Sequence, residues 1–336
     1  MELKFLKSLP LVFVCLFLRS SCYAQDIHFS QFFSAPLILN PALTGSFKGK
    51  VRAVTNYRNQ WTQAMGNNFE TFSISVDAPV YKEKFFSGLY VYSDKSGDSK
   101  MISNSANLSL ASRIALDYKN NLTFGINTGW VQKKIDLTQV TWNSQYDGNT
   151  FNGNLPSGEN ITSSSFSYVD FSAGVFWDSE VTKYLKLNGG ISSFHINSPK
   201  QSFYGNGDKL YTKWVVHGSS EIGFKNSNIT YIPTFMLLKQ GPTNEFDIGI
   251  IAKYNLGFDS KYTGINKSSN ILFGCFYRNK DAFNFYMGYD QKGRYAIGIS
   301  YDINVSDLRQ ASYYQGGFEV CLLYKFYNSH VTVNTK

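Results

Sequence analysis

The sequence has little charge and no apolar run of the length that a membrane-spanning helix needs. Charged residues make up 17% of the chain, and the mean hydropathy is -0.23. The apolar run from Leu9 to Leu18 is too short to cross a bilayer as a helix. A helical membrane protein is therefore excluded, whereas a transmembrane β-barrel is not, because only alternate residues of its strands face lipid.

Cysteine is also scarce. Of the four cysteines, Cys15 and Cys22 belong to an N-terminal leader, which leaves Cys275 and Cys321. We expect these two on strands that lie three strand spacings, about 14 Å, apart, which is too far for a disulfide. Cys275 shares its strand phase with apolar residues, so we expect it to face lipid. No metal ion or other cofactor is expected, because His28, His195 and His330 are scattered, with no cysteine or carboxylate at metal-ligand spacing.

Residues 1–24 have the features of a signal peptide. Lys4 and Lys7 precede the short apolar run, and small residues precede a predicted cleavage point after Ala24. A lipoprotein signal through Cys22 is the alternative, although Arg19 stands where such signals prefer an apolar residue. We therefore expect an exported chain, and with no clustered basic stripe we expect no nucleic-acid partner.

Aromatic residues and glycine are abundant, with 23 Tyr, 28 Phe and 27 Gly against eight Pro. Strand-forming aromatic residues between glycine-containing turns favour an all-β fold. In "GRYAIGISYDIN" the apolar residues alternate with small or polar ones, which places Tyr301 on one face and Asp302 on the other. The same phase predicts Phe318 toward lipid and Glu319 toward the lumen of a barrel.

Fourteen segments show this two-residue period, and most reach the 9–11 residues that a tilted strand needs to cross a bilayer. They span residues 47–58, 67–80, 84–94, 101–118, 121–133, 166–179, 182–196, 210–226, 228–239, 243–257, 268–279, 282–291, 293–304 and 315–327. Short connections alternate with long ones along most of the chain, as in barrels with periplasmic turns and outside loops. The tenth and eleventh connections break this rule, so the boundaries around 239–282 are the least defined.

We predict an all-β chain: an outer-membrane antiparallel β-barrel of about 14 strands over residues 47–327, with a tail at 328–336. A soluble β-sandwich or propeller is the alternative. Residues 25–46 do not alternate and include Asn40 and Pro41. They form either a plug at the periplasmic mouth or a flexible lead-in, and their apolar content favours packing.

Three residues of "NYRNQW" have two interpretations. Arg58, Gln60 and Trp61 either hold the plug or a partner near the barrel mouth, or have a structural role. In the structural interpretation, which we favour, Arg58 pairs inside the barrel while Trp61 joins an aromatic girdle.

His217, Ser219 and Glu221 are the nearest approach to a catalytic set. They alternate along one predicted strand, where neighbours on one face stand about 7 Å apart and point in parallel. A Ser–His–acid site needs hydrogen-bond distances between its members, so we interpret the three as polar residues of the lumen. We expect no catalytic residues and no enzyme activity.

Five stretches in order resemble the PorP/SprF family of type IX secretion outer-membrane proteins of gliding and secreting Bacteroidota. They are "QDIHFSQFFSAPLILNPALTG", "NYRNQW", "IPTFMLLKQGPTNEFDIG", "GCFYRNKDAFNFYMGY" and "ISYDINVSDLRQASYYQGGFEVCLLY". Together they cover nearly the whole mature chain. Family members often have a glycine where this chain has Tyr313 or Tyr314.

The resemblance implies an outer-membrane partner of large secreted cargo with a C-terminal secretion domain, such as a gliding adhesin. It leaves open a part in the secretion machine itself, beside its periplasmic or outer-membrane components. An outer-membrane channel for small or hydrophobic solutes and an outer-membrane hydrolase are the alternatives. The long loop at 136–165 is the predicted cargo contact, through Trp142, Tyr146 and Phe151, because aromatic residues are enriched at interface anchors.

Overall fold

The computed structural model describes residues 26–60, 69–97, 101–137, 140–146, 148, 150–158, 163–203, 208–257, 268–307, 309–310 and 312–327. The predicted signal peptide at 1–24, the predicted tail at 328–336 and Trp61 lie outside the described residues.

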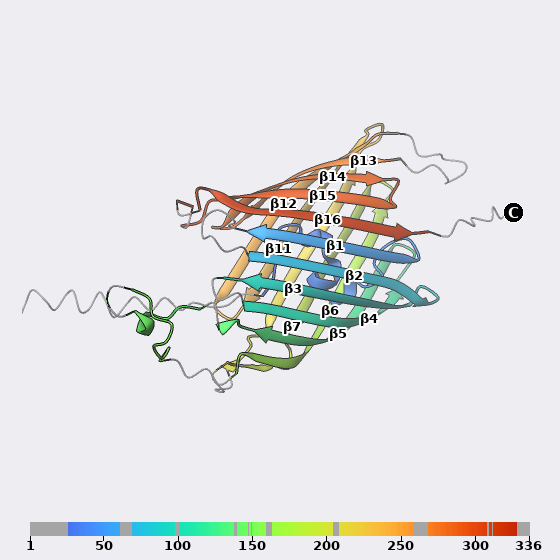
Figure 1. Cartoon of the computed structure of the whole chain (residues 1–336). Helices are drawn as coiled ribbons and strands as arrows, with labels where there is room; N and C mark the ends of the chain where they lie inside the picture. Colours follow the sequence, from blue (N-terminus) through green and yellow to red (C-terminus); the bar gives the residue numbers. More distant parts are fainter. Residues whose placement is uncertain are drawn as a thin grey trace, which may run out of the picture.

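The described chain forms one closed antiparallel barrel of fourteen strands (Figure 1). Its strands are β1 (Val51–Gln60), β2 (Phe69–Tyr81), β3 (Phe85–Ser96), β4 (Met101–Ala115), β5 (Asn120–Lys134), β6 (Ser165–Thr182), β7 (Leu185–Phe194), β10 (Lys213–Gly223), β11 (Ile229–Gln240), β12 (Thr243–Asn255), β13 (Asn270–Arg278), β14 (Ala282–Gln291), β15 (Tyr295–Asn304) and β16 (Gln315–Phe326). A small two-stranded sheet of β8 (Lys200–Gln201) and β9 (Asp208–Lys209) lies in the connection between β7 and β10.

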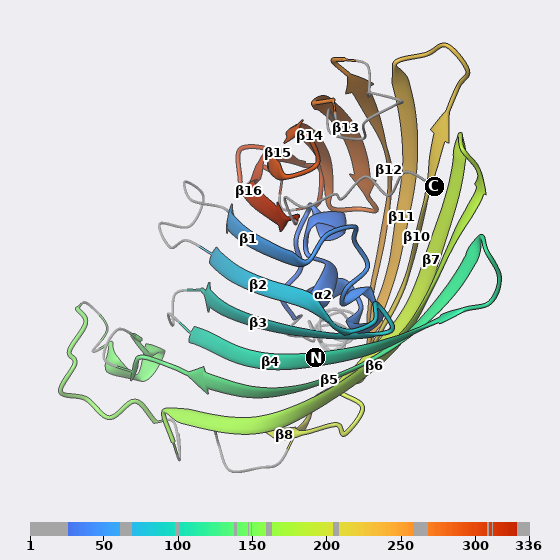
Figure 2. The same ribbon diagram turned by 90° about the vertical axis from the view of Figure 1, so that its right-hand side faces the viewer.

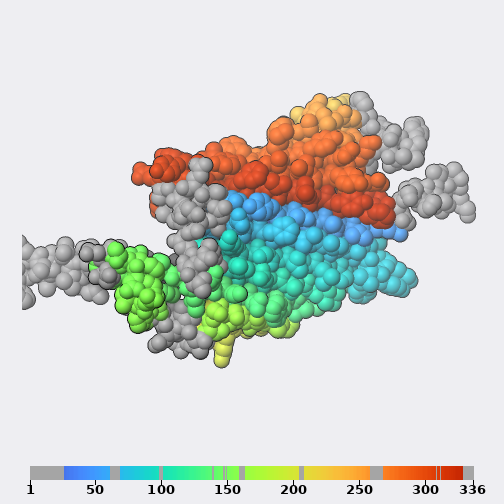
Figure 3. Space-filling view, viewed as in Figure 1, coloured from blue at the N-terminus to red at the C-terminus, as the bar shows by residue number. Residues whose placement is uncertain are grey.

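The predicted barrel is confirmed. Each of the fourteen predicted segments coincides with one strand to within a few residues at either end, and this includes the boundaries around 239–282, at β11 to β14. β1 pairs with β16 over its full length and closes the barrel, with Arg58 directly opposite Glu319. Figure 3 shows the first and last strands side by side on the outer surface, so the two ends of the barrel sequence share one seam.

The two faces of the wall alternate as the sequence predicts. Tyr301 and Phe318 expose 44% and 43% of their surface on the outside, whereas Asp302 and Glu319 expose 1% each toward the lumen. The outward side chains form an apolar belt that only lipid can cover without cost. The two-residue period of the sequence therefore has the predicted cause: one face of the wall meets lipid and the other meets the lumen.

The barrel has two unlike ends. Six mostly short connections, which include 82–84, 116–119 and 183–184, lie at one end, here called the turn end. The longer connections, which include 135–164 and 195–212, lie at the other, here called the loop end. The connection at 256–269 is a long exception at the turn end, and 279–281 is a tight exception at the loop end. By the usual orientation of such barrels the turn end faces the periplasm.

Residues 26–47, here called the plug, lie inside the lumen (Figure 2). The plug contains three short helical turns: η1 (Phe32–Ser34), α2 (Pro36–Leu39) and η2 (Pro41–Leu43). Pro36 and Pro41 each begin a turn, where a missing backbone N–H costs nothing. Across the residues described, no helix is long and apolar enough to span a membrane.

The two cysteines among the described residues, Cys275 and Cys321, are free and lie as the strand phase predicts. Cys275 is exposed on the outer face of β13, and Cys321 is buried on the lumen face of β16. The Cys321 thiol donates a long hydrogen bond of 3.9 Å to the plug carbonyl of Ser34. The absence of a disulfide between them agrees with their positions on non-adjacent strands.

The lipid face can be tested at Ile299, which lies in the middle of β15 and points outward. Ile299→Lys should cost about 2–4 kcal/mol in the folded barrel, because a cation near mid-bilayer loses its hydration. Urea titration of the protein refolded into lipid vesicles measures the free energy of unfolding. The control is Ile299→Leu, which should change it by less than about 1.5 kcal/mol. Equal tolerance of both variants would contradict the assigned face.

Candidate functional site

The plug is joined to the barrel seam by a buried ionic network, here called the seam anchor. Its members are Arg58 of β1, Arg278 of β13, Asp302 of β15 and Glu319 of β16, all almost fully buried. Asp302 Oδ2 lies 2.8 Å from Arg278 Nη2 and 3.4 Å from Arg58 Nη2. Glu319 Oε2 lies 3.9 Å from Arg58 Nε. Two arginines thus face two acidic side chains inside the lumen, the pairing that buried charged groups require.

The seam anchor holds the backbone of the plug. Glu319 accepts hydrogen bonds from the backbone N–H groups of Ser30 and Gln31, at 2.7 and 3.1 Å. The Ser30 hydroxyl donates to Asp302 at 2.6 Å. Arg58 Nη1 donates to the carbonyl of His28 at 2.5 Å. Charge-assisted hydrogen bonds of this kind are about twice as strong as neutral ones.

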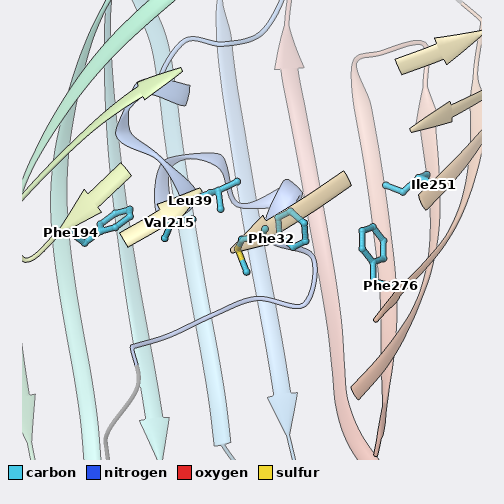
Figure 4. Close-up of a cluster of buried hydrophobic side chains, with 7 residues drawn as sticks. Phe32, Leu39, Phe194, Val215, Ile251 and Phe276 are labelled. Carbon is cyan, nitrogen blue, oxygen red and sulfur yellow. The ribbon is translucent and has the colours of Figure 1, made fainter. Parts of the chain in front are cut away.

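An apolar cluster lies between the plug and the opposite wall (Figure 4). Phe32 and Leu39 of the plug contact side chains of the wall strands β7, β10, β11, β12 and β13. The wall members are Phe194, Val215, Met236, Ile251 and Phe276. Phe33 stacks on Phe276 with ring centroids 5.3 Å apart. The plug therefore has its own hydrophobic core inside the barrel, and each side chain in it adds about 1.5–3 kcal/mol of burial.

Asn40 fixes the middle of the plug. Its Nδ2 donates to the carbonyls of Val175 and Ile191 in the wall, at 3.1 and 3.4 Å. Its Oδ1 accepts from the N–H of Ala42 and caps η2. Glycine residues of the wall leave the space that Asn40 occupies: a Cβ at Gly174 would lie 2.0 Å from Asn40 Oδ1. A Cβ at Gly125 would likewise lie 2.3 Å from the Pro41 backbone, so both sites exclude larger residues.

A second ion pair, here called the turn-end anchor, secures the last part of the plug. Arg52 makes two hydrogen bonds to Asp77, of 2.9 and 2.7 Å, and both residues are buried. Asp77 also accepts from the N–H of Gly45 at 2.7 Å. Arg52 donates in turn to the carbonyl of Leu43. The plug thus leaves the lumen beside the first residues of β1.

The first plug residue is held near the loop end by a third group, here called the loop-end anchor. Asp26 Oδ2 lies 2.5 Å from His195 Nε2 and 3.1 Å from Lys213 Nζ. His195 Nδ1 lies 2.9 Å from Asp170 Oδ1. Burial alone would raise the pKa of Asp26, but the Lys213 and His195 cations hold it well below its usual 3.8. Burial alone would lower the pKa of His195, which lies one residue beyond β7, but Asp26 and Asp170 raise it to about 9.

The predicted position of the plug needs correction. A plug at the periplasmic mouth would contact only the turn end, whereas residues 26–31 contact the loop-end half of β1, β15 and β16. Charged side chains of the wall hold the start of the plug near the loop end, and the apolar composition of the segment did not predict these partners. The plug extends from the loop-end anchor to the turn-end anchor.

The predicted mouth residues separate in the structure. Asn40 and Pro41 belong to the plug itself. Arg58 combines both of its predicted roles, because it pairs inside the barrel and also holds the plug backbone. Gln60 ends β1 at the loop end, opposite Gly317.

The predicted cargo residues lie on the loop between β5 and β6. Tyr146 and Phe151 form an isolated antiparallel bridge, with their rings edge to face and the centroids 5.7 Å apart. Both rings are exposed, and Trp142 beside them is half-buried. The short turn η4 (Asn143–Gln145) connects Trp142 to this pair. The three aromatic residues thus share one small structured region at the loop end.

The polar set on β10 does not converge. His217 contacts Asn40 of the plug, Ser219 exchanges hydrogen bonds with Asn188, and Glu221 pairs with Lys253. Among the described residues no group of three or more His, Cys, Asp or Glu is placed to hold a metal ion.

Sequence reasoning missed the anchoring roles of Arg52, Asp77, His195 and Arg278. The sequence feature that could have identified them is a charged residue at a lumen-facing strand position between apolar neighbours. That signal found Asp302 and Glu319 but named no partner, because Asp302 and Arg58 are separated by 244 residues.

A closed barrel of long strands with an apolar belt defines the molecule as an outer-membrane β-barrel protein. The sequence matches the family described as type IX secretion system membrane protein PorP/SprF over residues 21–324. The chain belongs to this family. A comparison with curated proteins finds no significant match.

Several solved structures of outer-membrane proteins are similar to this chain. The toluene transporter TbuX of Ralstonia pickettii is 10% identical, with a TM-score of 0.51 over 88% of this chain and 94% of that one. A FadL homologue of Pseudomonas aeruginosa is 9% identical, with a TM-score of 0.48 over 88% and 94%. The toluene transporter TodX of Pseudomonas putida is 10% identical, with a TM-score of 0.46 over 89% and 93%. At such identity the likeness to TbuX concerns the fold alone.

The seam anchor can be tested by removal of its central carboxylate. Asp302→Ala leaves two buried guanidinium groups without this partner and should cost about 3–5 kcal/mol in the free energy of unfolding. Asp281→Ala is the matched control, because Asp281 pairs with the same Arg278 but is 42% exposed at the loop end. It should cost about 1 kcal/mol or less. Similar losses in both variants, measured by urea titration in vesicles, would show that Asp302 does not organise the network.

The loop-end anchor should give a pH-dependent stability. The raised pKa of His195 means that its contribution is complete below pH 6.5 and is lost as the pH rises through about 9. The lowered pKa of Asp26 means that its contribution is present above pH 3.8 and is lost as the pH falls below that value. The difference in unfolding free energy between the natural chain and Asp26→Asn should therefore be largest between about pH 4 and 6.5. A difference that stays constant up to pH 10 would contradict this arrangement.

Proposed function

We propose that this barrel is a non-enzymatic cargo partner of the type IX secretion system, which supports the secretion or surface attachment of a large protein at its loop end. The observation that carries the proposal is the plug. A lumen filled from the loop-end anchor to the turn-end anchor leaves the outer surface and the loops as the places where a large partner can bind.

The loop at 135–164 provides the contact. Its length of 30 residues exceeds what a connection between neighbouring strands requires. The exposed Tyr146 and Phe151 are held by their own bridge, so little side-chain freedom is lost when a partner covers them. Small polar residues around them can adapt to the partner surface. Membership of the PorP/SprF family supports a protein of the secretion pathway as that partner.

The absence of enzyme activity belongs to the proposal. Its support is that His217, Ser219 and Glu221 are each bonded to a different neighbour. None of the three is aligned with the next for proton transfer. A Ser219→Ala variant should therefore secrete and display cargo as the natural chain does.

A solute channel is the second candidate. A small pocket between the plug and the wall, lined mainly by apolar residues that include Phe32, Leu39 and Met236, is the feature that favours it. Flux of a small aromatic hydrocarbon into vesicles that contain the purified barrel separates the two functions. The cargo function predicts no flux above that of empty vesicles.

The cargo function is tested by a deletion in the loop. Replacement of residues 143–163 by a short Gly/Ser linker should leave a folded barrel in the outer membrane. The surface amount of proteins with a C-terminal secretion domain should fall about tenfold or more, because aromatic anchors often contribute about 2 kcal/mol to an interface. Mass spectrometry of the cell surface and of the medium measures the loss.

A triple variant refines this test. Trp142→Ala, Tyr146→Ala and Phe151→Ala keep the loop length but remove the three aromatic side chains, and should reproduce most of the loss. The control is Phe166→Ala with Phe203→Ala, which removes an aromatic pair near the same loop, with centroids 4.7 Å apart, outside the proposed contact. Unchanged cargo display in the deletion variant would refute the assignment of the loop.

A further inference from the structure

The two ends of the barrel differ in charge. Among the described residues, the six turn-end connections contain seven Lys or Arg residues and two Asp or Glu residues. The described parts of the seven loop-end connections contain four Lys or Arg residues and four Asp or Glu residues. Lys48 and Lys50 add to the positive charge of the turn end just before β1 begins. An asymmetry of this size points to an anionic partner at the turn end and not at the loop end.

Three turns repeat one local arrangement, in which a lysine lies over the ring of an adjacent tyrosine. Lys82 Nζ is 5.0 Å from the ring centroid of Tyr81, and Lys183 Nζ is 4.7 Å from that of Tyr184. At the turn between β4 and β5, Lys119 Nζ lies 5.4 Å from the ring of Tyr118. A tyrosine at the end of the apolar belt with an ammonium group above it matches the boundary between acyl chains and headgroups.

Most of these cations have no acidic partner of their own. In the described parts of the six turn-end connections, five exposed lysines form no salt bridge: Lys82, Lys84, Lys183, Lys225 and Lys292. They come from four turns spread around the barrel, between β2 and β3, β6 and β7, β10 and β11, and β14 and β15. Their charge is therefore available to an external anion.

We propose that this ring of turn-end lysines binds the headgroups of anionic phospholipids in the leaflet at the turn end. The spread of the lysines around the circumference favours lipid, since an annulus of lipid contacts every turn whereas a single acidic protein would contact one sector. The ring continues directly into the lipid-facing belt at Val80, Phe85 and Leu116. This inference is independent of the cargo function and concerns the opposite end of the molecule.

Two natural tryptophans allow the proposal to be tested leaflet by leaflet. Trp177 faces lipid near the turn end of β6, and Trp214 faces lipid as the second residue of β10 at the loop end. Variants that keep only one of them, with the other four tryptophans changed to phenylalanine, are reconstituted in vesicles of phosphatidylcholine with increasing phosphatidylglycerol. Brominated phosphatidylglycerol quenches the fluorescence of a tryptophan that it contacts, and brominated phosphatidylcholine provides the reference.

At Trp177 we expect phosphatidylglycerol to be favoured over phosphatidylcholine by about fivefold, the contribution of one lysine near an anionic surface. At Trp214 we expect no preference. Substitution of all five lysines by glutamine should reduce the preference at Trp177 to about one. The matched control substitutes five exposed loop-end lysines and should leave it unchanged: Lys134, Lys200, Lys209, Lys239 and Lys280. Inorganic phosphate at millimolar concentration should not compete, because the lipid surface and not free phosphate is the ligand.

Three results would overturn the proposal. An equal preference at Trp177 and Trp214 would mean that the turn end is not special. A preference that survives the five glutamine substitutions would mean that the lysines are not its source. Loss of the preference in the presence of inorganic phosphate would assign the lysines to a soluble anion. A folding defect in the five-lysine variant is detected by its heat-modifiable migration, and the pairs Lys82→Gln with Lys84→Gln and Lys183→Gln with Lys292→Gln then serve instead, each with a partial loss expected.

Discussion

The ion pairs between Asp302, Glu319 and the two arginines are the interaction on which the rest of the structure depends. They join three parts of the molecule: the closing pair of strands β1 and β16, the strands β15 and β13 further along the wall, and the backbone of the plug. Four charges inside a barrel are unfavourable unless each is paired and hydrogen-bonded. The plug supplies the missing donors through Ser30 and Gln31. Closure of the barrel and insertion of the plug are therefore coupled. If either occurred without the other, the buried charged groups would lose some of their hydrogen-bond partners.

This coupling explains how one chain presents three different surfaces. The lumen is occupied by the plug, the belt between the two ends is committed to lipid, and the loop end carries an aromatic group on a long loop. A barrel that is filled by its own N-terminal segment provides a rigid support at the loop end. Binding residues are commonly found on loops that a rigid scaffold positions. The excess of lysine and arginine lies at the opposite end of the same scaffold.

The strands and their two faces could be predicted from the sequence, because alternation is a local property that "GRYAIGISYDIN" displays within twelve residues. The lumen position of Asp302 followed from the same phase. Its partners Arg58 and Arg278 did not follow, since the pairing depends on a closing seam between the first and last strands. The path of the plug could not be predicted from local sequence patterns either, because the contact between Asp26 and His195 follows from no spacing in the sequence. The glycines at 125 and 174 acquire their meaning only beside Pro41 and Asn40.

The central claim is that the plug occupies the lumen in the folded protein in a membrane. Electrical recording across a planar bilayer with the purified barrel inserted tests this claim most directly. A filled lumen predicts no steady ionic current from the natural chain, and a current in the variant that lacks residues 26–44, provided that this variant shows heat-modifiable folding. A stable open conductance from the natural chain would contradict the account.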